Sequence, residues 1–355
     1  MRQDNIIFSG PNPFAQFGKC KELTILLDTD RFMFVASLNA TYMMATFDST
    51  VSVLEGTEDK FLKAYTIPLS LIFPLFKLDT GTKDNSLTLT TTADKVTIKY
   101  NDVEVESDIY SPNGLTIQQI KSIDIAKSQE VDPAPFIAIT DVFGPTKDNF
   151  CNVDGNTLFI SDENKCLIHK SKEDYGKKFS LPIPFIKLMK SMAVTKLHIG
   201  DNVVAETKSG VSLVTNLTKI TDPNVLLDYK FAARTKSDDV YVLRINKYMK
   251  KISLAVQSVE LSASLDFIKR KLILTSDHNE RVEMTLNNYE LSKQGEVDFF
   301  AAMKQSSSGK SLMLHDARLI RSLATFPEVK VKVCPGFLLA KLGKDYNLMF
   351  NLGKI

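Results

Sequence analysis

The run best suited to chemistry in this sequence is Ser307-Ser308-Gly309-Lys310-Ser311, near the C-terminus. A phosphate-binding loop ends in this way, because its backbone N–H groups and its lysine hold the phosphates of a nucleotide. That loop also needs a glycine five residues before Gly309, where this chain has Lys304. No strand, loop and long helix surround the run, so we interpret it as a polar turn between a helix and a strand.

The histidines and cysteines are isolated from one another along the chain. No second ligand stands at metal spacing from any histidine, which favours strand or surface positions for His169, His198, His278 and His315. No C-x-x-C spacing occurs, which favours a reducing compartment over a disulfide framework or a zinc site for Cys20, Cys151, Cys166 and Cys334. Because no nucleophile, base and oxyanion site can be assembled, we expect no enzymatic activity, no cofactor and no metal.

The composition of the chain is that of an ordinary globular protein. Its 355 residues are 44% hydrophobic and 24% charged, which suits two or three domains that each bury a core. The most apolar stretch, 67–76, is interrupted by Pro68, Ser70 and Pro74, so we expect neither a signal peptide nor a membrane span. A net charge of +2 is too small for DNA binding by overall charge, so any basic surface must be local.

One pattern of elements occurs three times, about every 115 residues. Each copy opens on a hydrophobic strand: Phe32 to Ser37, Thr157 to Asp162 and Lys271 to Ser276. Each then has a short strand that runs into a helix: Thr66 to Leu69, Ser180 to Ile183 and Glu296 to Phe299. Each closes on a further strand: Ser86 to Leu89, Lys196 to Ile199 and Ser311 to Leu314. A period of this length indicates a duplicated domain.

Alternation of apolar and polar residues dominates the chain, whereas helical periodicity is short and rare. We therefore predict an α+β protein of three similar domains, each an antiparallel sheet with short helices. Polar turn residues gather near 111–114 and 233–239. The predicted domains are 1–110, 111–232 and 233–355.

The short helices combine an apolar face with lysines. In the helix predicted over 182–192, Phe185, Ile186 and Met189 point inward, and Lys187 and Lys190 share the opposite face. A helix predicted over 244–257 has the same design, and the helices predicted over 69–77 and 298–304 each end in lysine. The repeated design favours a basic surface made of Lys77, Lys187, Lys190, Lys247, Lys250, Lys251 and Lys304.

Four segments carry a resemblance to a known family: 156–167, 179–182, 222–229 and 346–352. They are similar to a strand with a threonine-aspartate-glycine-histidine-arginine-leucine end, a valine-proline helix entry, a proline-aspartate-tyrosine loop and a C-terminal strand. The chain thus resembles the bacterial-type sliding clamp, the β subunit of DNA polymerase III, in the diverged form that phages carry. It departs from the family at Glu163, Asn164 and Leu227, and it lacks the methionine-proline-methionine tail.

The resemblance implies a DNA clamp fold that assembles into a ring. Two chains would close head to tail as a homodimer, and double-stranded DNA would pass through the hole without sequence specificity. The expected partners are the replicative DNA polymerase and the clamp loader, with no membrane, in the cytoplasm of a bacterial host. Lysines on inward-facing helices would attract phosphate without reading bases, which permits sliding.

The resemblance also implies a pocket for a short apolar peptide of those partners. Carried over by position, it would consist of Ser161, Lys165, Cys166, Leu167, Leu227, Phe231, Met349, Phe350 and Leu352. Because Glu163 and Asn164 differ from the family, the preferred peptide could differ too. A phage virion ring or tail protein is the alternative from another class, and a β-rich enzyme with no visible site is a third. The lysine-bearing helices favour the clamp.

Overall fold

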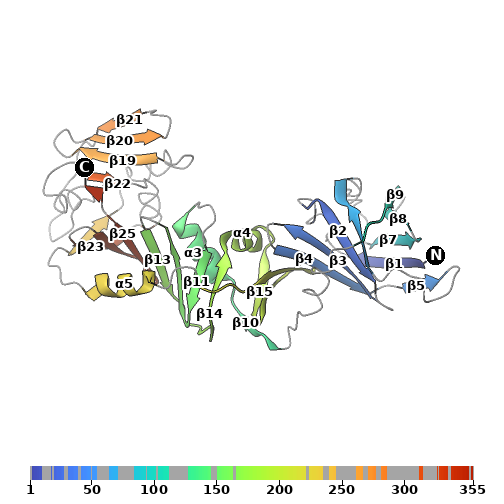
Figure 1. Cartoon of the computed structure of the whole chain (residues 1–355). Coiled ribbons are helices and arrows are strands. Elements are labelled where there is room, and N and C mark those ends of the chain that lie inside the picture. The colour runs from blue at the N-terminus through green and yellow to red at the C-terminus, as the bar shows by residue number, and fades with distance from the viewer. Residues whose placement is uncertain are drawn as a thin grey trace. The chain divides into compact units, whose positions relative to one another are not determined.

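The structure is a computed structural model that describes residues 2–9, 17, 20–27, 31–38, 41–48, 50–53, 64–70, 84–92, 94–100, 103–111, 127–144, 150–162, 165–220, 224–234, 240–244, 261–266, 271–276, 281–285, 312–314, 326, 328–334, 337–351 and 353–354. The chain divides into two compact units. Unit 1 comprises Met1–Pro133 and Lys187–Leu217, and unit 2 comprises Ala134–Ile186 and Thr218–Ile355. Each unit contains two antiparallel sheets (Figure 1).

Unit 1 contains a five-stranded sheet, sheet A, and an eight-stranded sheet, sheet B. The strands of sheet A are β1 (Arg2–Ser9), β5 (Thr50–Val53), β7 (Asp84–Thr91), β8 (Lys95–Tyr100) and β9 (Val103–Asp108), in the order β5-β1-β7-β8-β9. Those of sheet B are β2 (Glu22–Leu27), β3 (Arg31–Leu38), β4 (Thr41–Asp48), β6 (Ala64–Pro68), β10 (Gln129–Val131), β15 (Val194–Ile199), β16 (Asn202–Thr207) and β17 (Val211–Asn216). Their order is β10-β15-β16-β17-β4-β3-β2-β6.

Unit 2 repeats this plan with an eight-stranded sheet C and a five-stranded sheet D. The strands of sheet C are β11 (Phe150–Asp154), β12 (Thr157–Ser161), β13 (Lys165–Lys170), β14 (Lys178–Pro182), β18 (Val240–Arg244), β23 (Glu328–Cys334), β24 (Phe337–Leu342) and β25 (Tyr346–Asn351), in the order β14-β11-β12-β13-β25-β24-β23-β18. Those of sheet D are β19 (Leu261–Asp266), β20 (Lys271–Ser276), β21 (Arg281–Thr285), β22 (Leu312–Leu314) and β26 (Gly353–Lys354). Their order is β21-β20-β19-β22-β26.

Sheets A and B of unit 1 are joined through buried side chains. Tyr65 of β6 is 1% exposed, and its hydroxyl lies 3.2 Å from the hydroxyl of Thr91 on β7. Strand β6 also bridges to Tyr110, with backbone hydrogen bonds in both directions between Thr66 and Tyr110. Because a buried tyrosine hydroxyl needs a polar partner, the Tyr65–Thr91 contact fixes one sheet against the other.

Helix α3 (Ala134–Phe143) packs on one face of sheet C and has a well-defined end. Gly144 follows it with a φ of 91°, a conformation that glycine adopts without strain, and its N–H donates to Thr140 O. The side-chain amino group of Lys165, on β13, donates to Phe143 O at 3.0 Å. A lysine at a helix C-terminus opposes the negative end of the helix dipole.

Two further helices complete the described elements: α4 (Ile183–Ser191) and α5 (Val225–Arg234). In unit 2, α5 lies beside β23 and β25, whereas α3 lies beside β11 and β13 (Figure 1). Asp228 in the first turn of α5 and Arg234 in its last turn both suit the helix dipole. No helix within the described residues is both long and apolar enough to cross a membrane.

The predicted α+β class, antiparallel sheets and short helices are confirmed. The three opening strands correspond to β3, β12 and β20, and the three closing strands fall in β7, β15 and β22. The predicted helix over 182–192 is α4, whereas Arg244, predicted to begin a helix, ends strand β18. Strand pairing overrides the helical pattern there, because Arg244 is paired with Glu328 of β23. The remainder of that helix, 245–257, lies outside the described residues.

The two units do not follow the three predicted domains. Strand β4 pairs with β17, and β13 pairs with β25, so each eight-stranded sheet combines residues from two predicted domains. A sheet can continue from one domain into the next, so these pairings do not test where the domains begin and end. The boundaries at 110 and 232 therefore stay predictions.

Candidate functional site

Lys187 and Lys190, two of the predicted DNA-contacting residues, lie on α4 and are exposed. On the other face of the helix, Phe185, Ile186 and Met189 are at most 1% exposed. The predicted design, with an apolar face and a basic face, is thus confirmed for this helix. Charge at these two lysines can change without disturbing the core.

The other predicted DNA-contacting lysines lie outside the described residues: Lys77, Lys247, Lys250, Lys251 and Lys304. Contact with DNA stays a prediction for all seven.

The predicted peptide pocket depends on the register of β13 and β25, which the structure shows. Cys166 is paired with Met349, and Lys165 is paired with Phe350. Directly paired residues share a face of the sheet, and successive residues of a strand face opposite ways. One face of sheet C therefore carries Cys166 and Met349, and the opposite face carries Lys165, Leu167 and Phe350.

The face with Cys166 is covered by α5. Cys166 packs with Phe159, Ile168 and Leu226 of α5 in one buried cluster. Partly buried side chains pack against this cluster, namely Ile220, Tyr229 and Met349. Ser161, half-buried, is paired with Cys166 on the neighbouring strand. Three of the predicted pocket residues are thus brought together beside α5, and we call this side of sheet C the α5 face.

The opposite face is covered by α3 and is closed. Leu167 and Phe350 are both 0% exposed, and Lys165 is 3% exposed. The amino group of Lys165 also lies over the ring of Phe143, 4.3 Å from its centroid. These three residues belong to the core between sheet C and α3, so the structure does not bring them to the surface where Cys166 and Met349 lie.

Changing Lys165 to Ala should lower the free energy of unfolding by about 2 kcal/mol, because the buried stem, the bond to Phe143 O and the ring contact are all lost. Urea unfolding measures this loss, and Lys170→Ala, exposed at the end of the same strand, is the matched control. The control should change stability by less than about 0.5 kcal/mol. Unchanged stability of Lys165→Ala, with weakened peptide binding, would return Lys165 to the pocket.

The remaining predicted pocket residues lie on α5 or near the C-terminus. Leu227 is 62% exposed on the outer side of α5. Phe231 belongs to α5, but its side chain is outside the described residues, as is Leu352. Peptide binding by these residues stays a prediction.

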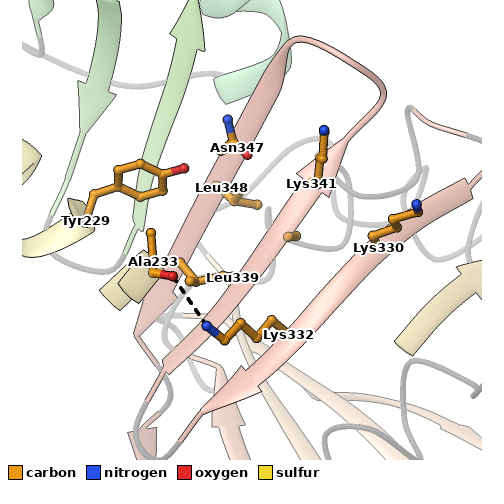
Figure 2. Close-up of a pocket in the computed structure, with 9 residues that line it drawn as sticks. Tyr229, Ala233, Lys330, Lys332, Leu339, Lys341, Asn347 and Leu348 are labelled. Carbon is orange, nitrogen blue, oxygen red and sulfur yellow. Dashed lines mark hydrogen bonds between the residues drawn. The ribbon is translucent and has the colours of Figure 1, made fainter. Parts of the chain in front are cut away.

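A pocket of about 250 Å³ lies between α5 and strands β23, β24 and β25. Figure 2 shows Tyr229 and Ala233 of α5 on one side and side chains of the three strands on the other. The lining residues are Tyr229, Ala233, Lys330, Lys332, Leu339, Ala340, Lys341, Asn347 and Leu348. Burial raises the pKa of Tyr229, so its hydroxyl stays protonated and can donate a hydrogen bond into the pocket at neutral pH.

One row of paired residues connects this pocket with the predicted one. Lys332 is paired with Leu339, Leu339 with Met349, and Met349 with Cys166, so all four share the α5 face. The pocket is therefore continuous with the part of the predicted site that the structure brings together. The residues that sequence reasoning missed are Tyr229, Lys330, Lys332, Leu339, Lys341 and Asn347. Alternation through Val329-Lys330-Val331-Lys332-Val333 was the available signal, because it places two lysines on one face of a strand.

The described cysteines do not have the properties of nucleophiles. Burial raises the pKa of the Cys20 thiol to about 11 and raises that of Cys151 as well. Cys166 is 2% exposed within the cluster under α5. A thiol that stays protonated at neutral pH is inert, because the thiolate is the reactive form.

Comparisons with known proteins show the fold. No protein-family model matches the chain, and no curated protein matches it in sequence. Among solved structures, the DNA polymerase sliding clamp of Caulobacter crescentus is 13% identical with a TM-score of 0.66, and the match covers 99% of this chain and 100% of that chain. The DNA polymerase III β subunits of Pseudomonas aeruginosa and Thermotoga maritima match over the same shares, at 10% and 12% identity and TM-scores of 0.64 and 0.61. The predicted clamp fold is confirmed.

Proposed function

We propose that the chain is a DNA sliding clamp, a processivity factor that encircles double-stranded DNA and tethers a replicative polymerase to it. The observation that carries this proposal is the similarity to solved sliding clamps over the whole length of both chains. Such a protein acts by topology and binding and catalyses no reaction. We place it in the cytoplasm, where replication takes place, and infer a phage-encoded form from its divergence.

The ring would form from two chains that pair head to tail, each with three domains over 1–110, 111–232 and 233–355. Support comes from the sheet edges: β9 ends sheet A within the described residues, and β21 ends sheet D. Strand β9 exposes Val103, Glu104, Glu106 and Asp108. An open edge strand invites pairing with another chain, and a closed homodimer would cover it.

DNA would be held by the lysine-bearing helices. Lys187 and Lys190 of α4 supply two exposed positive charges three residues apart. Contacts of lysine with phosphate are independent of sequence and sensitive to salt, so a clamp can slide along the duplex. A closed ring stays on DNA without strong overall charge, which suits the net charge of +2.

The pocket under α5 would receive a short peptide of the polymerase and of the clamp loader. It is concave and has an apolar lining from Ala233 and Leu339, with a few polar groups around it. Such a site fixes apolar side chains by burial and orients them by hydrogen bonds.

The experiment that tests the proposal compares retention on closed circular and linear duplex DNA of equal length. A clamp loaded onto the circle should remain bound through gel filtration in about 0.5 M salt, because only ring opening releases it after charge contacts are screened. The same protein should leave the linear DNA within the run by sliding off its ends. Cutting the circle should release the bound fraction.

The control is linear DNA with both ends blocked by bulky protein, which should retain the ring as the circle does. Equal loss from circular and open linear DNA would overturn the proposal. A mass of one chain in solution at micromolar concentration would contradict the stable homodimer.

A further inference from the structure

The α5 face of sheet C contains two lysines in an unfavourable position. Lys330 of β23 and Lys341 of β24 are directly paired across the two strands. Like charges directly opposite one another in an antiparallel pair repel. Both side chains are exposed, and Figure 2 shows them on neighbouring strands at one side of the pocket. Repulsion of this kind is relieved when an anion binds between the two ammonium groups.

Nothing within the described part of the chain neutralises this pair. None of the nine pocket-lining residues carries a carboxylate, and no described carboxylate forms an ion pair with Lys330 or Lys341. The next member of the row is Asn347, paired with Lys341, and its amide is neutral. The amino group of Lys332 lies 3.4 Å from Ala233 O, which keeps this third positive charge beside the pocket as well.

The pocket beside the lysines is apolar and small. Leu339 and Ala233 line it, together with the ring of Tyr229. Its volume of about 250 Å³ is less than that of sites for drug-sized molecules, about 300–1,000 Å³, and suits one or two side chains. A nucleic-acid backbone would satisfy the lysines but would leave these apolar groups without a partner. An apolar side chain next to a carboxylate satisfies both.

We infer that the α5 pocket binds an acidic apolar peptide, in which leucine- or phenylalanine-like side chains enter the pocket and flanking aspartate or glutamate carboxylates contact Lys330 and Lys341. This inference rests on the proposed function and names the chemistry of the partner segment. Charge complementarity at a rim changes specificity and the association rate, while the buried apolar anchors supply most of the affinity.

The test uses two labelled eight-residue peptides with a leucine-phenylalanine core, one flanked by three aspartates on each side and the other by three asparagines on each side. Fluorescence anisotropy with the full chain at about 50 mM salt should show the aspartate peptide bound about tenfold more tightly, the size expected of two or three partly exposed ion pairs. The preference should fall below about twofold at 0.5 M salt, because the charges are then screened.

Variants identify the residues responsible. Lys330→Gln combined with Lys341→Gln should abolish the preference and leave the asparagine peptide unchanged, and glutamate at both positions should reverse it. The matched control is Lys170→Gln with Lys172→Gln, two exposed lysines outside the pocket lining. Equal binding of the two peptides, no binding of either, or competition by a single-stranded oligonucleotide would each overturn the inference. If the chain shows no preference for the aspartate peptide but stays on circular DNA, only this inference is contradicted. If the chain shows the preference but does not stay on circular DNA, only the clamp function is contradicted.

Discussion

Replacement of Lys187 and Lys190 by glutamate should weaken the equilibrium binding of the chain to linear duplex DNA by about tenfold or more at physiological salt. Each change removes one positive charge and adds one negative charge on the exposed side of α4. A plot of log K against log salt has a negative slope, and each lost phosphate contact makes this slope shallower by about 0.9. Two lost contacts should therefore make it shallower by about 2 per chain.

The folded state should survive this double change. The buried face of α4, represented by Phe185 and Met189, keeps its contacts, and exposed substitutions away from such contacts alter stability by about 0.5 kcal/mol or less. Solution mass and the urea midpoint check that the assembly and fold are intact. A reduced salt slope with unchanged stability assigns the effect to DNA contact.

Lys170→Glu with Lys172→Glu is the matched control, since it changes net charge by the same amount at two other exposed lysines. If the control weakens DNA binding as much as the α4 variant, the effect belongs to net charge, and α4 does not face DNA. An unchanged salt slope in the α4 variant leads to the same conclusion.

Much of the fold could be predicted because its main signals are local. Short hydrophobic runs identified strands such as 32–37 and 271–276, and the repeated order of strands and helix identified a duplicated unit. The continuity of sheets B and C could not be predicted, because it depends on pairings such as β4 with β17 and β13 with β25, whose residues are far apart in sequence.

Helices α3 and α5 were not predicted, for different reasons. In α3 nearly every position is apolar, so its sequence, Ala134–Phe143, has little of the contrast between faces that marks a helix. In α5 the resemblance to a family loop over 222–229 concealed a helix that begins at Val225. That helix supplies Tyr229 and Ala233 to the pocket, so the omission also removed one side of the candidate site.

The candidate pocket was predicted by position along the chain, and this explains why it combines residues from both faces of sheet C. Lys165, Cys166 and Leu167 are consecutive in strand β13, so only the middle one can share a face with Met349. The pairing register, which the sequence does not reveal, selects Cys166. The same alternation places Lys330 and Lys332 on that face, although no motif drew attention to them.

Met349 and Phe350, neighbours in β25, should therefore give opposite results when each is changed to Ala. Phe350 is 0% exposed on the α3 side, so its truncation leaves a cavity and should cost about 3–5 kcal/mol of unfolding free energy. Met349 is partly buried beside Leu339 and Tyr229 on the α5 face, so its truncation should cost only about 1 kcal/mol. Its main effect should be on the aspartate peptide, whose affinity should fall by about tenfold, as expected for the loss of an apolar anchor.

Urea unfolding and fluorescence anisotropy on the same two variants separate the roles. Phe350→Leu, which refills most of the core volume, should recover much of the stability lost in Phe350→Ala, and peptide binding by the folded fraction should be normal in both. Loss of peptide binding in Phe350→Ala at full stability would place Phe350 in the pocket and would mean that the register of β13 and β25 is wrong. Because one residue's shift in register exchanges the two faces of a strand, this pair of variants tests the site and the sheet in one comparison.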